Sequence, residues 1–91
     1  MLSKDNNQRL LKLAMELVTN EYLENDTLRD SWIDVFDHVV GLVDFAYVQL
    51  VAIKEIGELT DRKSNFARRK LGNRLLTSLI KCCGEEAMDN D

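Results

Sequence analysis

Residues 32–57, WIDVFDHVVGLVDFAYVQLVAIKEIG, form the stretch that most constrains the fold of this chain. Apolar side chains dominate it, and between Phe45 and Ile53 only Gln49 is polar. The chain contains no proline and only four glycines, so little interrupts a helix. We therefore expect an all-α protein in which this stretch is one long central helix, or two stacked halves that meet at Gly41.

Apolar residues recur at helical spacing on both sides of the central stretch. This spacing predicts a first helix over about residues 5–23 and a third helix over about residues 62–83. The three segments predict a small bundle of three main helices in a single domain, residues 1–84. Four acidic residues and no basic one follow in residues 85–91, which we expect to be a disordered tail.

The central helix is predicted to begin near Thr27 or Ser31 and to end at Gly57, and Gly84 is predicted to end the third helix. A helix that is apolar nearly all round is buried on all sides. A chain of this size buries only about 60–65% of its unfolded surface, so it gains from self-association. We therefore predict a homodimer completed by the central helix. The predicted interface residues are Phe45, Tyr47, Val48 and Val51.

Charge is distributed along the chain in blocks. Residues 1–57 hold five basic and ten acidic side chains, whereas residues 58–84 hold seven basic and two acidic side chains. The formal net charge of the whole chain is −4, which argues weakly against general nucleic-acid binding. The blocks predict one acidic and one basic surface on the same molecule.

The acidic surface is predicted along the central helix. At about 100° per residue, Asp30, Asp34, Asp37 and Asp44 fall within about 80° of one another on a continuous helix. Carboxylates one turn apart lie roughly 6 Å from each other, which resembles phosphate spacing in nucleic acids. We predict that this face binds a protein partner, either by mimicking nucleic acid or by docking on a basic face. The alternative is an ordinary solvated face. Trp32 beside this face is most simply a core or staple residue, and the alternative is an anchor for the partner.

The basic surface is predicted along the third helix. Lys63, Lys70, Arg74 and Lys81 fall within about 40° of one another, and Arg69 flanks them. The row spans about 27 Å of helix, enough to follow a phosphate backbone or to meet an acidic protein surface. Here too the alternative is an ordinary solvated face.

Metal-dependent or acid–base chemistry has weaker support. Pairs of carboxylates one turn apart are similar to those with which helical nucleotide pyrophosphatases hold Mg²⁺. Such pairs occur at Glu21 and Glu24, Asp34 and Asp37, and Glu55 and Glu58. They lie near predicted helix ends, and no basic group completes a phosphate pocket. His38 is the only histidine, and the chain has neither a nucleophile–histidine–acid arrangement nor a glycine-rich phosphate loop. We expect no catalytic residues, no cofactor and no metal.

The cysteines and the apolar runs indicate the compartment. Cys82 and Cys83 are adjacent and form no disulfide framework, which is typical of a reducing environment. The N-terminal segment is too polar for a signal peptide. The most apolar run, residues 39–53, contains Asp44 and is shorter than the roughly 20 residues that a membrane span needs. We expect a cytoplasmic protein that does not enter a membrane.

These features favour a small non-enzymatic regulator or inhibitor that binds another protein through its charged helix faces. A phage-type anti-host factor or a nucleic-acid mimic fits the size and the acidic surface. One alternative is a nucleic-acid-binding regulator that uses the basic face of the third helix. The other is a metal-dependent enzyme similar to the helical nucleotide pyrophosphatases.

Overall fold

The computed structural model describes residues 4–20, 22, 23 and 25–84. Within these residues the chain forms helices and short connections, with no strand, so the predicted all-α fold is confirmed. The helices are α1 (Lys4–Val18), α2 (Asp26–Val39), α3 (Phe45–Val48), α4 (Lys54–Thr60) and α5 (Phe66–Cys83). A π-helical turn, Gln49–Ile53, joins α3 to α4 without a break. No described helix combines the length and the apolar character that crossing a membrane requires.

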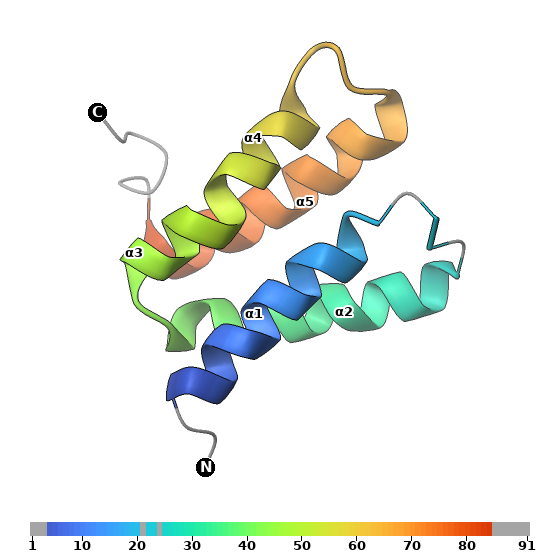
Figure 1. The fold of residues 1–91 in the computed structure, drawn as a ribbon. Coiled ribbons are helices and arrows are strands. Elements are labelled where there is room, and N and C mark those ends of the chain that lie inside the picture. Colours follow the sequence, from blue (N-terminus) through green and yellow to red (C-terminus); the bar gives the residue numbers. More distant parts are fainter. Residues whose placement is uncertain (1–3, 21, 24, 85–91) are drawn as a thin grey trace.

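The helices form two antiparallel hairpins that lie side by side (Figure 1). α1 and α2 make the first hairpin, and the continuous segment α3–α4 makes the second with α5. The loops of both hairpins lie at the same end of the molecule, so α1 and α4 form one layer while α2 and α5 form the other (Figure 1). The shortest dimension is 18 Å, which fits two layers of helices packed about 8–10 Å apart.

The central stretch is not one continuous helix, so that prediction is wrong. α2 ends at Val39, a 3₁₀ turn spans Val40–Leu42, and Val43 and Asp44 have extended backbones with ψ angles of 158° and 141°. The second interpretation, two halves meeting near Gly41, is closer to the structure. Because the two halves belong to different hairpins, the bundle has four helical segments within the described residues rather than three.

The reversal follows from the composition of the stretch. A glycine within a helix costs about 1 kcal/mol relative to alanine, and β-branched valines lose side-chain freedom there. Four of the five residues from Val39 to Val43 are therefore weak helix formers, Leu42 being the exception. When the chain folds back at this point, the apolar sides of both halves enter one core, which a single straight helix does not allow.

The core lies between the two layers and draws on all four helical segments. Its members recur every three or four residues, as expected for amphipathic helices. The buried apolar residues are Leu11, Ala14, Met15, Val18, Ile33, Phe36, Val39, Val40, Val48, Ala52, Ile56, Leu59, Leu75 and Leu79. Val48 is wholly buried within the single chain, so its prediction as a dimer contact is wrong.

Two asparagines begin the helices of the second layer. The side-chain oxygens of Asn25 and Asn65 each accept the backbone N–H three residues ahead at 2.9 Å, which satisfies a donor that the helix leaves unpaired. α2 therefore begins at Asp26, one residue before the earlier predicted start, and α5 begins at Phe66, about one turn later than predicted.

Three of the four glycines show different roles, and only one of the two predicted helix stops is confirmed. Gly84 follows α5 with a φ of 75°, and its N–H donates to the carbonyl oxygen of Ile80 at 2.9 Å. Gly57, in contrast, is exposed inside α4, which continues to Thr60. Gly72 is buried, and a Cβ placed there would lie 2.8 Å from side-chain atoms of Leu59 and Thr60. It therefore permits the close contact between α4 and α5.

We predict opposite effects for alanine at two of these glycines. A Cβ at Gly57 meets no atom within 4 Å, so Gly57→Ala should stabilise the fold by about 0.5–1 kcal/mol through helix propensity. Gly72→Ala should destabilise it by about 1–2 kcal/mol, because the overpacking outweighs the same gain. Urea unfolding followed by circular dichroism measures both. Equal midpoints for the two variants would contradict the close packing at Gly72.

Candidate functional site

The acidic and basic rows predicted from the sequence face each other within one chain. Asp30, Asp34 and Asp37 lie on α2, and the basic residues Lys70, Arg74, Lys81 and Arg69 lie on α5 in the same layer. Two predicted members lie elsewhere. Asp44 precedes α3, beyond the end of α2, and Lys63 lies in the loop before α5. Neither row therefore extends as far as predicted.

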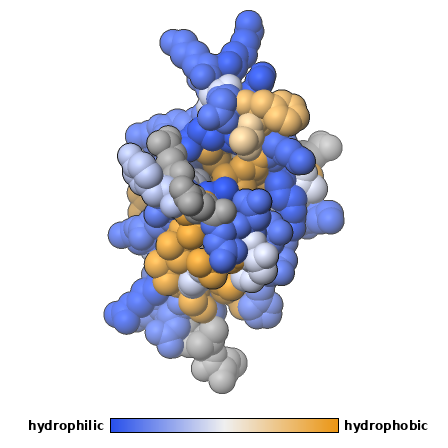
Figure 2. All heavy atoms as spheres, turned by 90° about the vertical axis from the view of Figure 1, so that its right-hand side faces the viewer, coloured by the Kyte–Doolittle hydropathy of each residue, from blue (hydrophilic) through white to orange (hydrophobic). Residues whose placement is uncertain are grey.

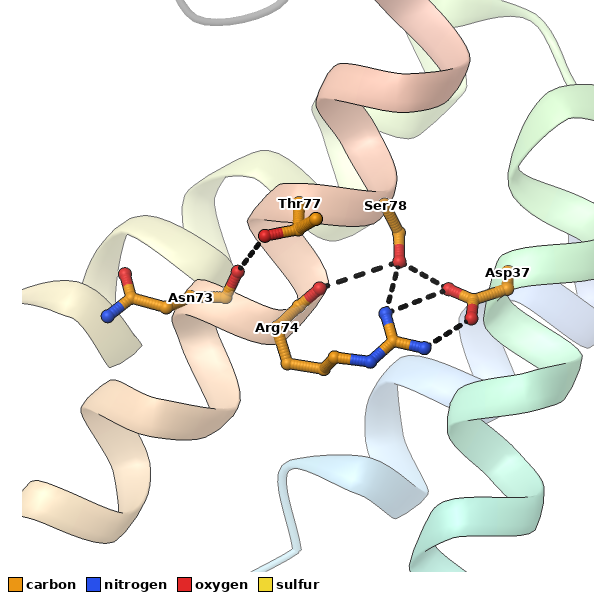
Figure 3. Close-up of polar contacts among 5 residues, drawn as sticks. All are labelled: Asp37, Asn73, Arg74, Thr77 and Ser78. Carbon is orange, nitrogen blue, oxygen red and sulfur yellow. Dashed lines mark hydrogen bonds and ion pairs between the residues drawn. The ribbon is translucent and has the colours of Figure 1, made fainter.

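One ion pair joins the two rows (Figure 3). Arg74 Nη2 donates to Asp37 Oδ2 at 2.6 Å, and Arg74 Nη1 lies 3.4 Å from Asp37 Oδ1. Ser78, one turn further along α5, accepts a hydrogen bond from Arg74 Nη1 at 2.6 Å and donates to Asp37 Oδ1. The three side chains thus form a closed network that connects α2 to α5.

Electrostatic effects within the layer extend beyond this contact. Partial burial of the Asp37 carboxylate raises its pKa, but hydrogen bonds from Arg74 and Ser78 and the charges of Arg74 and Lys81 outweigh it, so the pKa lies below 3.8. The hydrogen bond to Asp37 raises the pKa of Arg74 against the effect of burial, and the charges of Asp37, Asp34 and Asp30 add to the increase. The charged forms of Asp37 and Arg74 therefore stabilise each other, and Lys81, Asp34 and Asp30 contribute to this effect.

A cleft of about 660 Å³ opens between the hairpins. It lies between this ion pair and the end of the molecule that carries the hairpin loops. Its lining residues are Thr19, Asn20, Asp26, Arg29, Asp30, Ile33, Asp34, Ala67, Arg68, Lys70, Leu71 and Arg74. Ile33, Ala67 and Leu71 supply apolar surface, while aspartates border it on α2 and cations border it on α5. Figure 2, which views the molecule from the loop end, shows hydrophobic atoms surrounded by hydrophilic residues.

A second surface lies on the outward side of α5. Phe66 is 74% exposed, and it borders a shallow depression together with Arg69, Lys70 and Asn73. Lys70 therefore belongs both to the cleft and to this surface. An exposed aromatic ring among cations was not predicted from the sequence. Phe66 falls within the predicted third helix, but the spacing of residues did not assign it to either face of that helix.

The remaining predicted interaction residues differ in exposure. Trp32 is half-buried and packs against the core, so only part of its ring is available to a partner. Phe45 is 38% exposed, and Tyr47 and Val51 are half-buried. These three stay predictions for a dimer contact. Leu50, which the sequence interpretation did not single out, is far more exposed than any of them, at 74%.

The carboxylate pairs were candidates for a metal site. Glu21 and Glu24 lie outside the described residues. In the part of the chain that the structure describes, no three histidine, cysteine, aspartate or glutamate side chains are grouped closely enough to hold a metal ion. Asp34 contributes to the rim of the cleft, and Asp37 is held by Arg74.

Comparisons with known proteins do not identify the chain. No family model, curated protein or solved structure matches it. A function for this protein is therefore inferred from its own surfaces: the mixed-charge cleft, the outward face of α5 and the exposed side chain of Leu50.

The ion pair leads to a prediction about pH. Both side chains are partly exposed, at 34% for Asp37 and 45% for Arg74, so Asp37→Asn should lower the free energy of unfolding at pH 7 by only about 0.5–1.5 kcal/mol. Because folding depresses the pKa of Asp37, its contribution is present above the unfolded value of about 3.9 and is lost as the pH falls through the folded value.

Urea unfolding between pH 7 and pH 3 tests this expectation. The difference in stability between the wild type and Asp37→Asn should shrink below about pH 4. Asp30→Asn, an exposed position on the same helix, is the control and should have a smaller effect at every pH. A constant difference across the range would show that the carboxylate charge at position 37 does not stabilise the fold.

Proposed function

We propose that this protein is a small non-enzymatic regulator or inhibitor that binds another protein in the cleft between its two hairpins. The cleft itself carries the proposal. It offers apolar surface from Ile33, Ala67 and Leu71 between two charged rims. Apolar centres bordered by polar groups are the usual composition of protein-binding surfaces.

The arrangement of charge favours a protein partner over a compact ligand. Asp26, Asp30 and Asp34 follow one rim along α2, and cations follow the other along α5. Arg29 also lies on the α2 side, but its guanidinium donates to the carbonyl oxygens of Asn20 and Leu23. From Asp26 to Asp34 the α2 rim extends about 12 Å along the helix axis, or roughly two helical turns. A partner helix with an apolar side and oppositely charged flanks matches this pattern, as in other helix-in-groove complexes.

Nucleic-acid mimicry is a less favoured form of the same proposal. A mimic presents one sign of charge over a broad surface, whereas the α2 aspartates lie beside the cations of α5. Repulsion from these cations would oppose docking in a basic cleft. A mixed-charge partner segment avoids that cost.

Three wider expectations complete the proposal. The absence of a disulfide framework in the sequence supports a cytoplasmic location. The small core supports a homodimer, with Phe45, Tyr47 and Val51 as candidate contacts. The small size and negative net charge suit an anti-host factor of the phage type.

Filling the cleft should abolish partner binding without unfolding the protein. Ala67 is an exposed cleft residue on α5, so Ala67→Trp adds bulk there without removing a core contact. Thr77→Trp is the matched control, since Thr77 is exposed on the same helix outside the cleft. A photo-crosslinking residue at position 30 of the full chain, an exposed position at the edge of the cleft, first captures the partner, and calorimetry with the purified partner then compares the variants.

We expect Ala67→Trp to weaken binding by about tenfold or more, equivalent to about 1.4 kcal/mol. Thr77→Trp should bind as the wild type does, and both variants should keep the wild-type melting temperature. A partner that binds Ala67→Trp with wild-type affinity would rule out the cleft as its site.

Nucleic-acid binding is a second candidate, favoured by the outward face of α5. Phe66 is exposed beside Arg69, Lys70 and Asn73, and single strands bind to surfaces that combine cations with aromatic rings for stacking. The candidate residues differ from the predicted basic face, of which this surface contains only Arg69 and Lys70. Arg74 points toward Asp37 and is engaged in the ion pair, so it contributes less to an outward basic face.

The test is fluorescence anisotropy with a labelled single strand and a labelled duplex at several salt concentrations. If this face binds nucleic acid, Arg69→Glu with Lys70→Glu should abolish the salt-sensitive change in anisotropy. Each lost phosphate contact reduces the number of counterions that binding releases, and this release favours binding. Arg9→Glu with Arg62→Glu is the matched control, since both positions are exposed and lie outside this surface and outside the groove of Leu50. No binding by the wild type at low salt would eliminate this candidate.

A further inference from the structure

Leu50 projects from the second hairpin although it lies in the most apolar part of the chain. Its neighbours Val48, Ala52 and Ile56 point into the core, and two residues correspond to about 200° of helix rotation. Leu50 therefore points away from the core and is 74% exposed. It belongs to the π-helical turn Gln49–Ile53, a local widening of the helix that often accompanies functional sites.

A groove lies directly beside this exposed side chain. It has a volume of about 250 Å³ and runs between α1 and the α3–α4 segment. The lining residues are Lys12, Met15, Glu16, Thr19, Leu50, Val51, Lys54 and Glu55. Met15 and Val51 provide apolar surface, and two lysines and two glutamates surround it. The groove belongs to the layer of α1 and α4, whereas α2 and α5 supply most of the cleft.

A projecting side chain next to a groove is self-complementary. When two copies meet about a twofold axis, each residue that contacts the partner is contacted in return. We infer that a second copy of this chain covers the groove, so that Leu50 of each copy enters the groove of the other. The inference rests on the homodimer in the proposed function and identifies its contact.

The charges around the groove support a second copy as the occupant. Lys12 and Lys54 balance Glu16 and Glu55, so the surface has no net charge to repel its own copy. A twofold axis can place the lysines of one copy opposite the glutamates of the other. Tyr47 and Val51, predicted from the sequence as dimer residues, lie on the same helical segment and are half-buried, so they extend the apolar contact around Leu50.

Sedimentation equilibrium of the full chain, over a wide concentration range, tests the inference. The wild type should approach twice the mass of the 10.5 kDa chain. Leu50→Asp should raise the dimer dissociation constant by about 100-fold or more, because both copies lose a buried leucine. Phe66→Asp is the matched control, since Phe66 is equally exposed at 74%, and it should dimerise as the wild type does. At protein concentrations below the dimer dissociation constant, all three proteins should melt alike.

Charge reversal provides an independent measurement. Lys12→Glu with Lys54→Glu should leave a monomer, as should Glu16→Lys with Glu55→Lys. An equimolar mixture of these two variants should form a heterodimer, because each supplies the charges that the other lacks. Variants that each dimerise on their own, or a mixture that stays monomeric, would show that the groove is not the contact.

The outcomes separate this inference from the rest of the proposed function. A wild type that is monomeric at every concentration overturns the inference and the homodimer together, and leaves the groove to a different partner. If Leu50→Asp dimerises with the wild-type dissociation constant, the groove is not the contact, but the protein is still a homodimer. Binding in the cleft is measured separately with Ala67→Trp, so neither result decides it.

Discussion

The reversal of the chain at Val43 and Asp44 is the constraint on which the other features depend. It converts one apolar stretch into two helical segments whose buried sides share a core, with Phe36 and Val39 before the reversal and Val48 and Ala52 after it. The same reversal makes the second hairpin lie beside the first, so that α2 and α5 become neighbours in one layer (Figure 1). The charged rows, the cleft and the exposed leucine all follow from that placement.

The ion pair between Asp37 and Arg74 acts on geometry more than on stability. Partly exposed pairs contribute at most about 1 kcal/mol, far less than the burial of the apolar core. With Ser78, however, the pair fixes one point at which α2 and α5 meet. Toward the loops, the cleft lies between Asp30 and Asp34 on α2 and the cations of α5.

The helices could be predicted from the sequence, but their arrangement could not. Helical periodicity is a local signal and correctly predicts α1 and α5, although α1 ends at Val18, five residues before its predicted end, and α5 begins about one turn late. The spacing of the aspartates suited a continuous helix equally well, and a pattern of this kind does not reveal two extended residues such as Val43 and Asp44. The pairing of Asp37 with Arg74 depends on that reversal and was therefore also missed.

Leu50 shows why apolar stretches predict burial poorly at the level of single residues. Where nearly every position is apolar, periodicity no longer distinguishes the inner face from the outer one, and Val48 was assigned to the wrong side. The structure gives Val48 to the core and leaves Leu50 outside. If a second copy covers Leu50 in the layer of α1 and α4, most of the cleft residues on α2 and α5 stay exposed. The proposed dimer would then carry two clefts and could bind two partner segments at once, a gain in avidity without any new contact.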